Sequence, residues 1–190
     1  MKRLTLSDLH THTTFSDGKD SPLDMVFSAV DKGLEVLGFS DHSYTDFDES
    51  YCMRENDCFD YIEEIDCLKN QFADDITILC GIEQDFYSTA SLTGFDYVIG
   101  SVHYILPDGF SYDDGCSVLT PELLKDPLLE KKGAFIPVDE TPELLMGAAK
   151  VFFDGDIYAL AEKYFLTVSL VSVTFVPSSL VVTFSIFSDS

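Results

Sequence analysis

Short apolar runs alternate with amphipathic stretches along the N-terminal half of the chain. Each run suits one buried strand: one begins at Leu4, and the others cover residues 36–39, 76–82 and 95–102. Between them, apolar residues recur three or four positions apart after Pro22 and after Cys58, which predicts two helices. Strands that alternate with helices are typical of β-α units and a parallel sheet. The pattern therefore predicts an α/β fold.

The pattern is weaker between and beyond these elements. Residues 43–57 are polar and irregular, and a loop of this length in a compact domain is often functional. Residues 107–140 are rich in Pro, Gly and Asp and are predicted to be mostly loop. Helices are predicted again over residues 141–153 and 157–165.

Every predicted strand ends in a side chain that can bind a metal ion. These residues, which include all four histidines of the chain, are His10 and His12, His42, Glu83, and His103. Residues two apart on a strand share a face, so the first two histidines are expected to project together. A hydrogen bond to a backbone carbonyl is the ordinary explanation for one buried histidine, but four strand ends in agreement favour a metal site. Sites in parallel α/β folds and barrels gather at the carboxyl ends of strands.

The balance of acidic and basic residues limits the kinds of ligand that this chain is expected to bind. Lys and Arg total 11 against 34 Asp and Glu, for a formal net charge of -23, which argues against binding nucleic acid or an anionic membrane surface. Between Gly33 and Leu124 the only basic side chains are Arg54 and Lys69, so a phosphate ester bound there would need metal ions for positive charge. We find no Walker A loop, no G-x-G-x-x-G motif and no G-x-S-x-G elbow. These features favour metal-assisted hydrolysis of a small phosphate ester.

The cysteines indicate a reducing compartment. They are odd in number and form no C-x-x-C pair: Cys52, Cys58, Cys67, Cys80 and Cys116. We expect reduced thiols rather than disulfides or zinc ligands. No apolar signal-peptide region follows Met1, so a cytoplasmic protein is expected.

Several motifs, taken in order, resemble the PHP (polymerase and histidinol phosphatase) superfamily. They are His10-Thr11-His12 with Ser16-Asp17-Gly18, Ser40-Asp41-His42, Gly81-Ile82-Glu83 and Gly100-Ser101-Val102-His103. With Tyr104 and the segment from Phe153 to Leu160, the match resembles the monofunctional histidinol-phosphate phosphatases. The resemblance covers residues 4–165. It implies a distorted (β/α)7 TIM-like barrel of parallel strands, a multinuclear metal centre, and hydrolysis of L-histidinol phosphate to L-histidinol in histidine biosynthesis.

The resemblance also implies a set of ligands for two or three divalent metal ions (Zn, Mn or Fe), namely His10, His12, Asp17, His42, Glu83 and His103. The two N-terminal histidines would share one ion with Glu83. Glu83 would bridge to a second ion that His103 also binds, and these two residues are the expected catalytic ones. Asp17 and His42 would hold a third ion. Asp41 is expected to be a supporting or structural acid rather than a ligand.

The sequence departs from the family in its C-terminal part. Two later ligand motifs, a Gly-His pair and a Ser-Asp-Ala-His, do not appear, and no histidine follows His103. Only four barrel strands are predicted, so the barrel is expected to be incomplete. We expect the C-terminal part of the family domain to be missing or out of frame. We also expect this chain to be a poor catalyst and a protein of low stability.

The last residues differ from the rest in composition. From Leu166 to Ser188 the sequence contains no Asp, Glu, Lys or Arg, so we divide the chain into a PHP domain over residues 1–165 and an atypical uncharged tail over residues 166–190. An out-of-frame or truncated end explains this tail best. A β-hairpin fits its β-branched content better than a transmembrane helix, which Pro177 would interrupt.

Two alternatives to a histidinol-phosphate phosphatase stay open. One is a PHP phosphoesterase that acts on another small substrate. The other is a catalytically weakened fragment that binds metal or a partner without turnover. The expected partner is a small phosphate ester, without nucleic acid or membrane, and the oligomeric state stays open.

Overall fold

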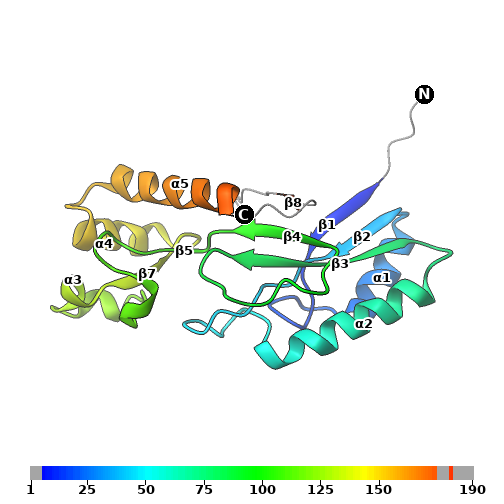
Figure 1. Ribbon diagram of the computed structural model, residues 1–190. Helices are drawn as coiled ribbons and strands as arrows, with labels where there is room; N and C mark the ends of the chain where they lie inside the picture. Colours follow the sequence, from blue (N-terminus) through cyan, green and yellow to red (C-terminus); the bar gives the residue numbers. More distant parts are fainter. Residues whose placement is uncertain (1–5, 175–179, 182–190) are drawn as a thin grey trace. The chain divides into compact units, whose positions relative to one another are not determined.

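The computed structural model describes residues 6–174 and 180–181 (Figure 1). These residues form two compact units: residues 6–100 with 180–181, and residues 101–174. The division of the chain at residue 165 stays a prediction.

The first unit is built on a sheet of parallel strands. In chain order they are β1 (Ser7–Thr11), β2 (Val36–Phe39), β3 (Thr77–Asp85) and β4 (Tyr97–Ser101). They lie side by side in this order, with the short β8 (Leu180–Val181) paired in parallel to β4. The four long strands form a curled half-barrel, so the predicted α/β fold with an incomplete TIM-like barrel is confirmed.

Two helices cover one face of this sheet, α1 (Pro22–Asp31) and α2 (Cys58–Gln71), as Figure 1 shows. The predicted N-cap of α1 is present, because the Ser21 hydroxyl accepts a hydrogen bond from the Asp24 amide over 3.2 Å. The apolar faces of both helices join the strands in one core that includes Val26, Ala29, Leu37, Phe39, Tyr61, Ile65, Leu68, Ile78 and Ile82. The three- to four-residue spacing of apolar side chains in these helices therefore reflects their burial against the sheet.

The Tyr97 side chain connects β4 to β1 and β2, across the intervening β3. Its hydroxyl lies 2.7 Å from the Leu9 carbonyl and 2.9 Å from the Phe39 carbonyl, so its single proton is shared between two acceptors. Its ring lies over two glycines: a Cβ on Gly81 would be 2.2 Å from the ring, and a Cβ on Gly38 would be 2.4 Å from the hydroxyl. The glycines in β2 and β3 therefore make the space that this cross-strand contact needs.

The second unit contains a small sheet of three strands in the order β5-β7-β6. They are β5 (Tyr104–Ile105), β6 (Ser117–Val118) and β7 (Ala134–Pro137), and short 3-10 helices at Tyr112–Asp114 and Leu123–Lys125 and the helix α3 (Leu129–Lys132) lie between them in the chain. The prediction of mostly loop over residues 107–140 was therefore incomplete. Strands of two residues are too short to show an alternating pattern, and the sheet forms only through contacts distant in sequence.

The last elements of the second unit are α4 (Pro142–Phe152) and α5 (Ile157–Thr174). Asp154 and Gly155 adopt positive φ and separate the two helices as the sequence predicted. However, α5 continues past Phe165, so the first residues of the predicted tail are helical and not part of a hairpin. The rest of that prediction concerns residues 175–179 and 182–190, which lie outside the described residues. Within the described part of the chain, no helix is long and apolar enough to cross a membrane.

We predict that Tyr97→Phe lowers the free energy of unfolding by about 1–3 kcal/mol, because two backbone carbonyls lose their shared donor. Gly81→Ala is expected to cost at least about 1–3 kcal/mol, since the added methyl group overlaps the Tyr97 ring. Urea unfolding followed by circular dichroism measures both. Tyr158→Phe is the matched control, because the Tyr158 side chain is 82% exposed, and its effect should stay within about 0.5 kcal/mol. A Tyr97→Phe variant as stable as the control would contradict the bridging role.

Candidate metal centre

The carboxyl ends of β1, β2 and β3 bring four of the predicted ligands together, namely His10, His12, His42 and Glu83. The pairing of β1 with β2 shifts between Asp8 and Thr11, which pair with Leu37 and Phe39. The Thr11 side chain turns away and donates a 2.9 Å hydrogen bond to the Gly38 carbonyl. His10 and His12 accordingly project together, with ring centroids 5.2 Å apart. The expected shared face of these two histidines is confirmed.

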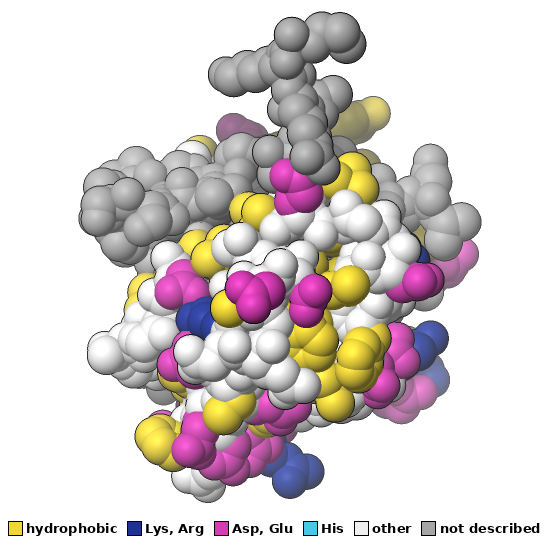
Figure 2. Space-filling model, turned by 90° about the vertical axis from the view of Figure 1, so that its right-hand side faces the viewer, with side chains coloured by type: hydrophobic (Ala, Val, Ile, Leu, Met, Phe, Trp, Pro, Cys, Tyr) yellow, Lys and Arg dark blue, Asp and Glu magenta, His cyan; other side chains and the backbone are white. Residues whose placement is uncertain are grey.

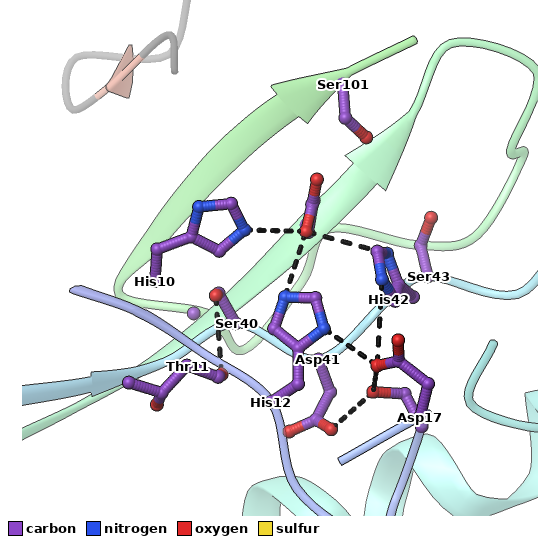
Figure 3. Close-up of polar contacts among 12 residues, drawn as sticks. His10, Thr11, His12, Asp17, Ser40, Asp41, His42, Ser43 and Ser101 are labelled. Carbon is purple, nitrogen blue, oxygen red and sulfur yellow. Dashed lines mark hydrogen bonds and ion pairs between the residues drawn. The ribbon is translucent and has the colours of Figure 1, made fainter. Parts of the chain in front are cut away.

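The Glu83 carboxylate lies at the centre of the first ligand group. Only 2% of the side chain is exposed, and its Oε2 lies 2.8 Å from His10 Nε2 and 3.0 Å from His12 Nε2. The same oxygen lies 3.5 Å from His42 Nδ1. Figure 3 shows these three imidazoles converging on one carboxylate. His42 reaches it because the pairing of β2 with β3 continues past Phe39 as a parallel bridge between His42 and Glu83.

Asp17 organises a second ligand group beside the first. Its Oδ1 lies 2.9 Å from His12 Nδ1 and 3.7 Å from His42 Nε2. The His12 and His42 rings meet edge to face, with centroids 4.2 Å apart. His12 thus offers one nitrogen to Glu83 and the other to Asp17, which joins the two groups (Figure 3).

Both groups have the chemistry and spacing of metal sites. Within each group of three, namely His10, His12 and Glu83, or His12, Asp17 and His42, the ligand atoms lie within 4.8 Å of one another. Imidazole nitrogen and carboxylate oxygen are ligands that Zn, Mn and Fe accept. The residues present therefore fit divalent metal ions.

The contacts within the two ligand groups shift the pKa values of His12 and Asp17 in the metal-free protein. Burial alone would lower the pKa of His12, but its hydrogen bonds with Glu83 and Asp17 outweigh burial and raise that pKa to about 9. For Asp17, burial raises the pKa, while the hydrogen bond from His12 and the nearby His42 lower it overall. The metal-free site therefore holds a protonated His12 between two carboxylates at neutral pH.

Two further predicted residues lie outside these groups. Asp41 is not among their ligands, because its buried carboxylate accepts hydrogen bonds from Thr13 and Ser16 instead. His103 belongs to the second unit, where its Nδ1 lies 3.3 Å from Ser101 Oγ and its carbonyl accepts a hydrogen bond from Val138. Its role as a ligand stays a prediction.

The sequence reasoning missed one aromatic neighbour of the site. The Tyr51 ring lies edge to face with the His42 imidazole, with centroids 4.9 Å apart. Tyr51 lies in a loop between His42 and Met53. A 3.0 Å hydrogen bond from the Met53 amide to the His42 carbonyl closes this loop. The irregular sequence of residues 43–57 predicted a loop but held no signal for this one residue.

An incomplete parallel barrel with imidazoles and carboxylates at the carboxyl ends of its strands defines a barrel-type α/β protein with a candidate metal centre. The chain belongs to the PHP domain family, whose family model matches residues 8–136.

Curated relatives match about half of this chain. It is 32% identical over 116 residues to the probable histidinol-phosphatase of Deinococcus radiodurans, which covers 55% of this chain and 45% of that protein. It is also 32% identical over 117 residues to the histidinol-phosphatase of Lactococcus lactis, covering 55% and 40%. A third relative is the DNA polymerase/3'-5' exonuclease PolX of Bacillus subtilis, 31% identical over 103 residues, covering 50% and 18%. The matched regions span less than half the length of these relatives.

A solved structure supports the fold. The putative histidinol phosphatase of Listeria monocytogenes matches 88% of this chain and 79% of its own, with a TM-score of 0.52 and 15% identity. At this identity the match bears on the fold alone.

We predict that the metal-free protein loses stability as pH rises toward about 9. The folded pKa of His12, about 9, lies above its ordinary value of 6.5, so the stabilisation is complete below pH 6.5 and disappears as pH rises through the folded pKa. Melting temperatures in EDTA at about pH 6 and about pH 10 measure the effect. The difference in melting temperature between wild type and His12→Gln should be smaller at the higher pH. An equal difference at both pH values would contradict the prediction.

Proposed function

We propose that this chain carries the active site of a metal-dependent phosphomonoester hydrolase that converts L-histidinol phosphate to L-histidinol in histidine biosynthesis. The observation that carries the proposal is the pair of ligand groups joined by His12 at the carboxyl ends of the strands. Metal ions bound there would polarise the phosphoryl oxygen and activate water for attack.

The residues have separable roles in this proposal. Glu83 would share one ion with His10 and His12, because its Oε2 lies within 3.0 Å of a nitrogen from each, and it is also the proposed bridge to a second ion. Asp17 and His42 complete the group on the other side of His12. His103 is the proposed further ligand and, with Glu83, a proposed catalytic residue. The site would hold two or three divalent ions (Zn, Mn or Fe).

The charge of the protein supports a site that works through metal ions. Acidic side chains spread over the face seen in Figure 2, with few Lys or Arg among them. A dianionic phosphate ester approaching such a surface is repelled unless bound cations reverse the local charge. Metal ions in both ligand groups would do so where the phosphate binds.

The names of two relatives support the choice of substrate, since one is named a histidinol-phosphatase and the other a probable histidinol-phosphatase. The third relative is a polymerase and exonuclease, so a PHP domain alone does not fix the substrate. A PHP phosphoesterase for another small phosphate ester is therefore the second candidate. The five cysteines are all unpaired thiols, which supports a cytoplasmic location.

We predict that the protein, desalted without chelator, carries at least about one divalent ion per chain, which elemental analysis measures. Glu83→Gln is expected to weaken metal affinity about tenfold or more, because the neutral amide is a poorer ligand and can bridge less well. Glu63→Gln, an exposed carboxylate on α2, is the matched control and should keep its metal. Folded wild-type protein with well under one ion per chain would count against the centre.

We also predict metal-dependent release of phosphate from L-histidinol phosphate after addition of Mn or Zn. The rate should be low, because His12 is shared with the first group and only Asp17 and His42 belong to the second group alone. Glu83→Gln should reduce the rate about tenfold or more, while Glu63→Gln should not. Faster hydrolysis of a different small phosphate ester would favour the second candidate. Robust turnover by Glu83→Gln would remove Glu83 from the catalytic role.

A further inference from the structure

We propose that Asp41 is a positioning residue that holds Asp17 in place and thereby sets the affinity of the second ligand group, His12, Asp17 and His42. The inference rests on the proposed metal centre. It does not depend on the identity of the substrate, because it concerns metal binding.

Asp17 is the ligand least supported by secondary structure. Its side chain is 49% exposed, and it lies in a turn after β1 rather than on a strand. The turn folds back on the chain before it, and a Cβ on Gly18 would lie 2.4 Å from the His12 carbonyl. The position of the Asp17 carboxylate therefore depends on what holds this turn.

Asp41 holds the turn at two points. Its Oδ1 accepts hydrogen bonds from the Thr13 amide over 2.7 Å and from the Ser16 hydroxyl over 2.6 Å. Its Oδ2 accepts a 3.0 Å hydrogen bond from the Thr13 hydroxyl. Both Asp41 and Thr13 are fully buried. Hydrogen bonds to a buried carboxylate are strong and costly to lose, so they fix Thr13 and Ser16, the two residues that hold the turn just before Asp17.

The backbone of Asp41 is fixed in turn by the sheet. Its carbonyl accepts a 3.0 Å hydrogen bond from the Glu83 amide, and the preceding Ser40 amide donates to the Thr11 carbonyl over 2.8 Å. The next residue is His42. Asp41 therefore connects the turn that carries Asp17 to His42, which follows it in the chain, and to β3, which carries Glu83. It does so without contacting a ligand atom.

An amide at position 41 would keep the shape of the side chain and replace one acceptor oxygen by an NH2 donor. The Thr13 hydroxyl would have to accept from this NH2 group instead of donating. The two hydrogen bonds that remain on the oxygen would lose the strength that the negative charge gives them. The turn would loosen around Asp17, whereas His10 and Glu83 would keep their places on β1 and β3. The expected consequence is a selective loss of affinity in the second group.

The test is a titration of metal-free protein with Co²⁺, followed by the visible absorption of the bound ion. In Asp41→Asn, one Co²⁺ equivalent should bind about tenfold or more weakly, while the other stays within about threefold. The Thr13 amide should also exchange its hydrogen faster in the metal-free variant, because its acceptor is weakened. Asp31→Asn removes an exposed carboxylate at the end of α1 and is the matched control for charge.

A milder variant covers the case in which Asp41→Asn does not fold. Ser16→Ala removes one donor, leaves the Asp41 carboxylate charged, and should weaken the same equivalent by a smaller factor. An equal loss of both equivalents, or no loss in either variant, would overturn the proposal. Wild-type protein that binds Co²⁺ at neither group would instead refute the proposed metal centre. Both outcomes are measured by metal binding alone, without substrate hydrolysis.

Discussion

The burial of the Glu83 carboxylate is the constraint on which the rest of the site depends. A buried carboxylate is costly unless positive charge or hydrogen-bond donors surround it. Glu83 is 2% exposed, and nitrogens of His10, His12 and His42 lie within 3.5 Å of its Oε2. In the metal-free protein a protonated His12 supplies the compensating charge. A divalent ion would supply a larger positive charge at the same place. The ligand side chains therefore already lie where such an ion would need them.

The parallel sheet satisfies this constraint by delivering its strand ends to one edge. Side chains that contact each other at this edge come from residues as far apart as His10 and Glu83. Tyr97 holds β1 and β2 through their carbonyls, and Asp41 holds the turn after β1. Neither residue belongs to a ligand group. The geometry of the site thus depends on buried polar groups whose hydrogen bonds cross from strand to strand.

The chain is similar to histidinol-phosphatases over about half of its length. The family model matches residues 8–136, which include all of β1 to β4 except Ser7, together with the two ligand groups of the first unit. The second unit contains His103 and a small sheet of very short strands. The role of His103 as a ligand is a proposal from the resemblance.

The sequence by itself determined the order of β-α units, the cap of α1, the family and five strand-end residues that can bind metal, because local periodicity and motif spacing encode them. Only the tertiary structure decided that His12 joins two ligand groups and that the Asp41 carboxylate accepts hydrogen bonds from Thr13 and Ser16. It also decided that residues 107–140 contain strands and that Tyr51 lies beside His42. These features arise from contacts between residues distant in the chain, for which a short window of sequence holds no signal.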